Sequence, residues 1–425
     1  MAFNGGIVKK KVILKGPLLT RSGYGEQARF ALRSLRSRED LFDIYIQPLQ
    51  WGKTSWISDM NEERNWIDKT IERTIEYLQN DGTFDMSVQV TIPNEFEKMA
   101  PINIGYTAGI ETTRVAHQWI QKANEMDKVI VVSNHSKQVF ENTEYQAQDN
   151  RTGQVFNLKT QVPIDAVNYP VKSFDSLPEL ELSLSTEFNF LTVAQTGPRK
   201  NLHNTIKWFV EEFRNEDVGL VVKSNISKNS LVDRQKLFGD MQGFLRQQGE
   251  RQCRVYLLHG DMTDEEMHSL YRNPQIDAYV SLPHGEGFGL PLFEAAYSGL
   301  PVVTTGWSGQ LDFLVDENGQ EHFYNVAFDL QQVQKEVVWD GVIIAESMWA
   351  FPREQSAKKQ MRLCYEHMTN EEIRGIKIIY LEKNVKRLRE TYSDDKMYKK
   401  FCSQVFERSQ DEDLWYKELD ELEGL

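Results

Sequence analysis

The sequence predicts an α/β fold made of two similar domains in tandem. At 425 residues the chain is long enough for two domains that each bury a core of their own. Short apolar runs bounded by turn residues alternate with amphipathic stretches, which is typical of parallel strands joined by crossover helices. We therefore predict an N-terminal domain over 1–172, a linker over 173–187, a C-terminal domain over 188–380 and a helical segment over 381–425 that packs across both domains.

Each domain is expected to be built from a series of buried strands. In the first domain KVILKG predicts the first strand and GEQARFALRSL predicts a helix with one apolar face, at 11–16 and 25–35. The remaining strands are expected at 42–47, 86–91, 102–107, 128–133, 188–195, 218–224, 253–260, 276–282 and 300–305. After Asn370 the chain is strongly charged, and residues 377–390 predict an amphipathic helix.

Composition narrows the class of protein. With 40% hydrophobic and 26% charged residues, the chain is expected to fold, and its net charge of −14 disfavours a protein that coats nucleic acid or anionic membrane with its whole surface. Its three cysteines, Cys253, Cys364 and Cys402, have neither disulfide nor zinc-ligand spacing, which favours a cytoplasmic location. We identify no signal peptide and no membrane-spanning run, so any contact with the inner membrane face would be peripheral.

The stretch HGEGFGLPLFEAAYSGLPVVTT, at 284–305, predicts a ligand site. It follows an expected strand with a glycine turn, and Pro291 suits the first position of a helix that Gly299 and Pro301 would end. In open α/β sheets, ligands bind beyond the carboxyl ends of the strands, where a helix start offers free backbone N–H groups to an anion. A phosphate group is therefore the expected ligand.

Two glutamates in this stretch indicate that the phosphate carries sugars. Glycines at 285, 287 and 289 would let the backbone approach a phosphate, whereas a carboxylate beside a phosphate is repulsive unless it binds hydroxyl groups. Because Glu286 lies in the turn and Glu294 in the helix, the two carboxylates can contact groups on the order of 10 Å apart. This spacing predicts a ligand of nucleotide-sugar length.

Several motifs resemble those of one enzyme family. The residues from Glu286 to Glu294 resemble the E-x7-E element of retaining glycosyltransferases with the GT-B fold, most closely the family numbered four. In the order of that family, the chain also has SGYGEQARFAL (22–32) for its N-terminal glycine loop, GIETTRVAHQWIQKANEMDKVIVVSNHSKQVF (109–140) for the end of its acceptor domain, FNFLTVAQTGPRKNLHNTI (188–206) for the start of its donor domain, and GLPVVTTGWSG (299–309) after the E-x7-E helix. The resemblance covers nearly the whole chain.

The resemblance implies a fold and a set of site residues. Two Rossmann-like domains would face a central cleft, and the C-terminal helices would cross back over the N-terminal domain. A nucleoside-diphosphate sugar would bind as co-substrate, with no cofactor and no metal. The catalytic residues implied are Glu286, Lys200 and Arg199, and the donor-binding residues implied are Glu294, Gly287, Phe288, Gly289, Leu290 and Lys223. Glu294 would hold the ribose, and the two cations would neutralise the leaving diphosphate.

The chain departs from the family at two positions. Where Gln195 stands the family usually has a basic residue, so the diphosphate would either be bound more weakly or depend on Arg199 or Lys223 instead. Many members also place a histidine beside the transferred sugar at the end of an acceptor-domain strand. In this chain that role falls to Glu111, to His117 or to neither of them, and a histidine on a helix surface is the simpler interpretation of His117.

The N-terminal region leaves the acceptor open. Gly23, Tyr24 and Gly25 form the loop SGYG, which would bring a helix start to the donor phosphate or to the acceptor. Residues 1–38 contain nine Lys and Arg residues and only one acid, Glu26, so this helix offers either a solvated basic face or a site for an anionic acceptor.

Several functions remain in competition. A surface polysaccharide or a lipid-linked glycan is the expected acceptor, and DNA with hydroxymethylated bases, as some phages glycosylate, is an alternative. A nucleotide-sugar epimerase of GT-B fold and a noncatalytic sugar-nucleotide-binding protein are further alternatives. The sequence does not distinguish between UDP, GDP and other donors, and it leaves the oligomeric state undetermined.

Overall fold

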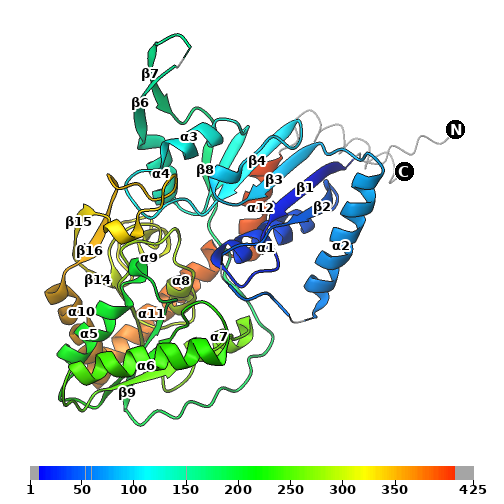
Figure 1. Ribbon diagram of the computed structural model, residues 1–425. Helices are drawn as coiled ribbons and strands as arrows, with labels where there is room; N and C mark the ends of the chain where they lie inside the picture. The colour runs from blue at the N-terminus through cyan, green and yellow to red at the C-terminus, as the bar shows by residue number, and fades with distance from the viewer. Residues whose placement is uncertain (1–8, 53, 59, 150, 407–425) are drawn as a thin grey trace.

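The computed structural model describes residues 9–52, 54–58, 60–149 and 151–406, and it contains two α/β domains on either side of a cavity (Figure 1). Each domain has a six-stranded sheet in which every neighbouring pair of strands is parallel. The strand orders are β2-β1-β3-β4-β5-β8 and β11-β10-β9-β12-β13-β14. The predicted pair of Rossmann-like domains is confirmed.

The N-terminal sheet is formed by strands that are buried on both faces. Its elements are β1 (Lys10–Gly16), α1 (Gly23–Arg36), β2 (Phe42–Pro48), α2 (Glu62–Gln79), β3 (Met86–Val90), β4 (Ile102–Thr107), α3 (His117–Ala123), β5 (Lys128–Val131), α4 (Asn134–Asn142) and β8 (Ile164–Ala166). In the central strand β1, Val12, Ile13 and Leu14 are almost completely buried, as expected for a strand covered by helices on both sides. β1 to β5 lie where the sequence predicts strands, within a few residues at each end, whereas β8 was not predicted.

The C-terminal sheet repeats this arrangement. Its elements are β9 (Phe188–Val193), α5 (Leu202–Glu212), β10 (Val218–Lys223), α6 (Leu231–Gln247), β11 (Arg254–Leu258), α7 (Asp264–Tyr271), β12 (Ala278–Ser281), α8 (Leu290–Tyr297), β13 (Val302–Thr305), α9 (Leu311–Leu314) and β14 (Tyr324–Val326). The order reverses between β9 and β12, so the segments that follow these two strands diverge and leave a crevice at the carboxyl edge of the sheet. Residues 198–200 and 284–290 come from these two segments.

Two hairpins were not expected from the sequence. One is the projecting pair β6 (Glu144–Gln148) and β7 (Val155–Lys159), which extends away from the N-terminal domain (Figure 1). The other pairs β15 (Phe328–Gln332) with β16 (Met348–Pro352). The connection between β15 and β16, residues 333–347, reaches across to the N-terminal domain and is called the arm below. The Asn94 side chain donates a hydrogen bond of 3.0 Å to the Gly341 carbonyl of the arm.

The C-terminal helices return to the N-terminal domain, as the resemblance implies. After α10 (Glu354–Thr369), the long helix α11 (Glu371–Thr391) packs on α8, and α12 (Asp394–Val405) packs on α1 (Figure 1). Phe401 of α12 is fully buried against Phe30 of α1, with ring centroids 5.4 Å apart. The domain limits drawn from the sequence stay predictions, and residues 407–425 of the expected helical segment lie outside the described residues.

The two domains touch through backbone that only glycine allows. A Cβ atom on Gly285 would lie 2.6 Å from the Glu111 carbonyl oxygen, and one on Gly287 would lie 2.8 Å from the Ala108 carbonyl oxygen. Both distances are shorter than any real Cβ contact, so these glycines fix how closely the turn after β12 approaches the loop after β4. Asp312 adds a polar contact, since its carboxylate accepts hydrogen bonds from Asn134 and Asn168.

This contact predicts the effect of a single methyl group. We expect Gly287→Ala to force the two domains apart, because the new Cβ meets backbone that belongs to the opposite domain. Small-angle X-ray scattering should show a larger radius of gyration than that of the parent. As a control, Gly243→Ala places its methyl in open space on α6 and should leave the radius unchanged. Identical scattering from all three proteins would contradict the prediction.

Candidate active site

A cavity of about 1320 Å³ lies between the domains and contains most of the predicted site residues. The C-terminal domain contributes the segments after β9, β10 and β12 and the start of α8, while the N-terminal domain contributes the start of α1 and the loop after β4. The predicted residues that line it are Glu286, Lys200, Arg199, Glu294, Gly287, Phe288, Gly289, Leu290, Lys223, Gly23, Tyr24 and Glu111.

Glu286 is held rigidly at the centre of this site. Its backbone N–H donates to the Ser308 hydroxyl at 2.8 Å, and its carbonyl accepts from the Gly309 N–H at 3.0 Å. Ser308 has a φ of 74°, which is rare for a residue other than glycine, and its hydroxyl also donates to Gln310. The strained conformation is therefore used to fix the position of Glu286.

The Glu286 carboxylate binds two cations. Its oxygens lie 2.8 Å from Arg199 Nη1 and 2.6 Å from Lys200 Nζ, and the residue is only 6% exposed. Burial alone would raise the pKa of the Glu286 carboxyl, but the two cations outweigh it and lower the pKa to about 2. Burial also lowers the pKa of the Lys200 ammonium, although Glu286 opposes this effect. Glu286 is therefore ionised at neutral pH.

Arg199 and Lys200 come from the segment after β9 and are positioned by its backbone. They lie in a short 3-10 turn (Pro198–Lys200), and the next residue, Asn201, has a left-handed φ of 50°. The Asn201 side chain donates to the Leu282 carbonyl at 3.0 Å, which ties this turn to β12. Arg199 also lies 3.2 Å from Glu111 and donates to the Gly285 carbonyl at 2.8 Å. It thus bridges an acid from each domain.

The start of α8 differs in detail from the expectation. The helix begins at Leu290, and Pro291 is its second residue rather than its first. Only Gly289 of the three glycines has a positive φ, 93°, and it forms the N-cap. Gly285 and Gly287 also allow close contact with the N-terminal domain, and that the three glycines make room for a phosphate stays a prediction. The Phe288 side chain is 3% exposed and packs in the core.

Glu294 lies one turn into α8, in a different environment. Tyr271 donates a hydrogen bond of 3.1 Å to its carboxylate. Burial raises the pKa of Glu294 to about 7, because Lys172, the main opposing charge, is countered by Asp264 and Glu26. The two carboxylates of the E-x7-E element therefore differ in charge state near neutral pH: Glu286 is ionised, and Glu294 is about half protonated.

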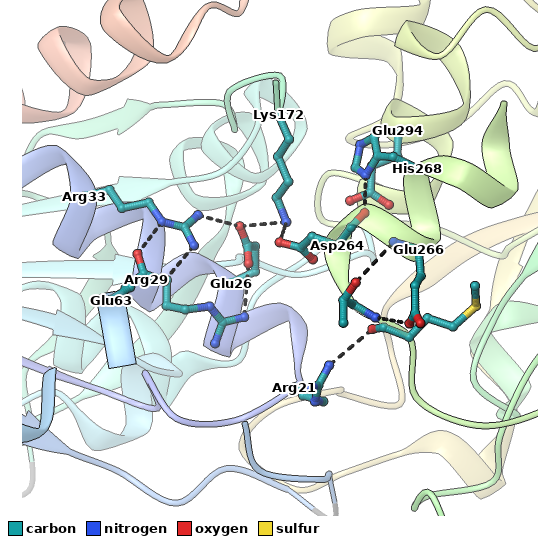
Figure 2. A network of polar contacts seen from close by, with 12 residues as sticks. Arg21, Glu26, Arg29, Arg33, Glu63, Lys172, Asp264, Glu266, His268 and Glu294 are labelled. Carbon is teal, nitrogen blue, oxygen red and sulfur yellow. Dashed lines mark hydrogen bonds and ion pairs between the residues drawn. The ribbon is translucent and has the colours of Figure 1, made fainter. Parts of the chain in front are cut away.

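Lys172 connects the two domains beside Glu294 (Figure 2). Its ammonium lies 3.1 Å from Glu26 of α1 and 2.8 Å from Asp264 of α7. Lys172 belongs to the segment that leads from the N-terminal to the C-terminal domain, so a single side chain ties both domains to their connection. Its acidic neighbours outweigh burial and raise the pKa of Lys172. The sequence analysis did not identify Lys172 or Asp264, since neither lies in a motif.

The basic face of α1 is not freely solvated, because its arginines are partly buried and contact other side chains; an anionic acceptor for this face stays a prediction. Arg29 lies 3.0 Å from Glu26, and Arg33 lies 2.6 Å from Glu63 and 3.2 Å from Glu26 (Figure 2). Arg36 lies over the Trp66 ring, with 4.4 Å between its guanidinium carbon and the ring centroid. Glu26 is the one acid in the basic N-terminal stretch, and it pairs with Arg29, Arg33 and Lys172. Its presence in the sequence was the one indication that these arginines are neutralised within the protein.

The glycine loop at the start of α1 lies in the N-terminal domain, whereas the donor-site candidates Lys223 and Gln195 lie in the C-terminal domain. The Ser22 hydroxyl caps α1 by accepting from the Gly25 N–H at 2.9 Å, and Tyr24 lines the cavity. Gly25 does not line it; a Cβ there would lie 2.0 Å from the Thr20 carbonyl oxygen, so its glycine serves local packing. Lys223 donates to the Gly260 carbonyl, and burial lowers the pKa of Lys223. Gln195 lines the cavity and donates to Ile226.

Of the two candidates for a residue beside the acceptor, Glu111 lies at the cavity and His117 does not. Glu111 lines the cavity and pairs with Arg199. His117 is exposed at the start of α3, where its ring lies 6.0 Å from that of Tyr145, and it does not line the cavity.

Within the described ranges, no group of three or more His, Cys, Asp or Glu side chains is arranged to hold a metal ion. No helix in the described part of the chain has the length and apolarity to cross a bilayer.

The fold and the site together define a class of protein. Two Rossmann-like domains with a cavity between them, and C-terminal helices that return to the first domain, constitute the GT-B fold. The family model described as "Glycosyl transferases group 1" matches residues 179–327, which contain Arg199, Lys200, Glu286 and Glu294. This match and the fold support a GT-B glycosyltransferase.

Solved structures of the same fold are distant in sequence. HepE from Anabaena, in complex with UDP and glucose, is 11% identical over 93% of this chain and 99% of its own, with a TM-score of 0.57. Sucrose-phosphate synthase from Thermosynechococcus elongatus is 10% identical over 93% and 98%, with a TM-score of 0.56. An E. coli trehalose-6-phosphate protein bound with UDP-2-fluoro glucose is 9% identical over 93% and 98%, with a TM-score of 0.55. No curated protein matches the sequence.

The raised pKa of Glu294 predicts how stability depends on pH. The folded chain holds this proton more tightly than the unfolded chain, whose carboxyl has a pKa near 4.5, so the stabilisation is lost as the pH rises from 4.5 through 7. Glu294→Gln keeps a neutral side chain at every pH. Relative to the parent, its free energy of unfolding should therefore rise by about 1–2 kcal/mol between pH 5 and pH 8.

Urea unfolding at the two pH values measures this difference. Glu382→Gln, which changes an exposed carboxylate on α11, is the matched control and should show no such rise. A Glu294→Gln protein whose stability followed that of the parent at both pH values would contradict the assignment.

Proposed function

We propose that this chain is a retaining, metal-independent glycosyltransferase that moves a sugar from a nucleoside-diphosphate donor to a hydroxyl acceptor in the interdomain cavity. The observation that carries the proposal is the Glu286 carboxylate between Arg199 and Lys200, just before the start of α8, with Glu294 one turn into that helix. The structures of HepE with UDP and glucose and of the E. coli protein with UDP-2-fluoro glucose support this donor class.

In the proposed complex, the donor lies along the segment from Gly287 to Glu294. Glu294 accepts hydrogen bonds from the ribose hydroxyls, and the free N–H groups at the start of α8 face the diphosphate. Arg199 and Lys200 turn from the Glu286 carboxylate towards the phosphate oxygens, and Glu286 is released to bind sugar hydroxyls. Lys223, the last residue of β10, adds a third cation to the donor side.

The reaction then needs no nucleophile from the protein. The bond between the anomeric carbon and the diphosphate oxygen breaks, the acceptor oxygen bonds to the same face of that carbon, and the acceptor proton passes to the leaving phosphate. Negative charge develops on the diphosphate as the bond breaks, so Arg199, Lys200 and the start of α8 stabilise the transition state more than the ground state. Glu111 pairs with Arg199 and therefore lies close to the leaving diphosphate, where its carboxylate would orient the acceptor hydroxyl.

The ion pairs of the N-terminal arginines favour one class of acceptor over another. A DNA acceptor was an alternative because of the basic stretch, but Arg29 and Arg33 are neutralised by Glu26 and Glu63. We therefore place a glycan acceptor, free or lipid-linked, ahead of DNA. A nucleotide-sugar epimerase remains the alternative chemistry, and an incubation with donor alone distinguishes it, because an epimerase would release an isomeric nucleotide sugar.

A thermal-shift panel of nucleotide sugars tests the proposal. A donor that binds only the folded chain raises its melting temperature by mass action. We expect at least one UDP- or GDP-sugar to raise it, and the shift should be reduced strongly in Glu294→Ala and only modestly in Glu286→Gln. If no nucleotide sugar stabilises the parent, or if Glu294→Ala responds as the parent does, the donor site is misassigned.

Turnover provides a separate prediction. Lys200→Ala removes one of the two cations that face the leaving group, so we expect kcat to fall on the order of 10²-fold, measured as nucleoside-diphosphate release. Lys207→Ala removes a lysine on the surface of α5 and should leave kcat unchanged. Parent-level turnover in Lys200→Ala would remove Lys200 from the catalytic site.

A further inference from the structure

The arm, residues 333–347, forms part of the cavity wall. It follows β15 directly and lies beyond residue 327, where the match to the glycosyltransferase family model ends. Trp339, Val342 and Ile343 of the arm line the cavity together with Tyr24, Trp51 and Ile110 of the N-terminal domain. An arm of one domain and a loop of the other thus share one part of the cavity.

The arm is fixed in this position by contacts to the N-terminal domain. Val342 is 6% exposed and belongs to the same apolar cluster as Trp119 and Ile110. At the arm's end, Thr113 and Met348 exchange hydrogen bonds of 2.9 and 3.0 Å. Within the arm, the backbones of Trp339 and Ile343 bond in both directions, at 3.0 and 2.8 Å. The tight turn carries the Trp339 side chain.

Trp339 has an unusually exposed side chain for a tryptophan whose backbone is held by hydrogen bonds on both sides of a tight turn. It is 56% exposed although it lines the cavity. Leaving a large indole in water gives up the stabilisation that its burial would supply, so an exposed tryptophan at a cavity is typical of a binding surface. Its position in a rigid turn means that little conformational entropy would be lost when a ligand packs on it.

The N-terminal side of the same region offers a second aromatic surface. The rings of Tyr24 and Trp51 lie 4.4 Å apart and line the cavity. The Tyr24 hydroxyl is 2.8 Å from the Thr107 hydroxyl and accepts from the Ala108 N–H at 3.3 Å, so this ring is held from behind. The lining on this side includes the uncharged polar residues Ser22, Thr54 and Asn61, and its nearest acid, Glu111, is paired with Arg199.

The charges of this region disfavour an anionic ligand. Each arginine that lines the N-terminal side already contacts acidic or carbonyl oxygens of the protein. These contacts are Arg21 with Asp261 and the Met262 carbonyl, Arg29 with Glu26 and the carbonyls of Leu18 and Thr20, Arg33 with Glu26 and Glu63, and Arg64 with Asp68 and the Ile57 carbonyl. A phosphate or carboxylate would have to break these pairs before it gained a cation.

We propose that Trp339, Trp51 and Tyr24 form a subsite for a neutral saccharide, with the arm as one wall. The inference rests on the proposed function and names the acceptor class for the same cavity. Sugar rings present C–H groups on their faces and hydroxyls at their edges. The C–H groups meet the negative face of an aromatic ring, and the hydroxyls reach the uncharged polar groups beside it. The subsite is incomplete without the arm.

Ligand-observed NMR on the full chain saturated with UDP tests the subsite. The probes are the neutral trisaccharides maltotriose, cellotriose and triacetylchitotriose, the anionic trigalacturonate, and n-octanol as an alkyl probe. We expect saturation transfer to the ring C–H protons of at least one neutral trisaccharide, and weaker transfer to trigalacturonate and n-octanol. In Trp339→Ala, the affinity for that trisaccharide should fall on the order of tenfold.

Two further variants complete the test. Trp51→Phe keeps a ring of smaller area and should weaken binding less than Trp339→Ala does. Trp56→Ala removes a tryptophan that is 48% exposed in the same loop as Trp51 but does not line the cavity, so it should bind as the parent does. Melting temperatures confirm that each variant is folded.

The outcomes separate this proposal from the proposed function. UDP affinity, measured by calorimetry, should be the same in the parent and in all three variants. If the parent binds no UDP, the proposed function fails. If UDP binds but no neutral trisaccharide does, or if trigalacturonate or n-octanol binds more tightly than the trisaccharides, the subsite proposal is overturned. Trisaccharide binding that Trp339→Ala leaves unchanged also overturns it.

Discussion

The site depends on one electrostatic arrangement, a carboxylate shared by two cations at the place where the domains meet. Glu286 would be costly to bury alone, and Arg199 and Lys200 would be costly to bury together, so each makes the others tolerable in a desolvated position. The strained backbone at Ser308 and the left-handed Asn201 are the local distortions that bring the three groups into register.

The same arrangement links the proposed catalytic residues to the contact between the domains. Arg199 bridges Glu286 of one domain and Glu111 of the other, and Gly285 and Gly287 allow the backbones to approach within contact distance. A second bridge, from Lys172 to Glu26 and Asp264, lies beside Glu294. Both acidic residues of the E-x7-E element therefore sit next to an ion pair that crosses the interface, and the geometry around each of them depends on the domains being together.

Sequence reasoning predicted the parts of this structure that are encoded locally. The strands were predictable because both faces are buried and leave continuous apolar runs, and the turn with Glu286 and Glu294 was predictable because a glycine turn and a helix start are adjacent in the chain. The roles of Gly285 and Gly287 were not predictable, since their contacts, Glu111 and Ala108, lie in the other domain. The hairpin of β6 and β7 was not predicted, because its exposed Val155 and Phe156 break the alternation of apolar and polar residues expected of a half-buried strand.

The position of α12 has a consequence for how the chain is made. Phe401 and Cys402 lie near the end of the described chain, yet they fill the core beside α1, where the Cys402 thiol also donates to the Ser34 carbonyl. During synthesis the ribosome therefore releases most of the first domain long before it releases the helix that covers it. Domains usually fold in order as they emerge, but here the first domain stays uncovered until α12 emerges, so its apolar surface is exposed to aggregation in the interval.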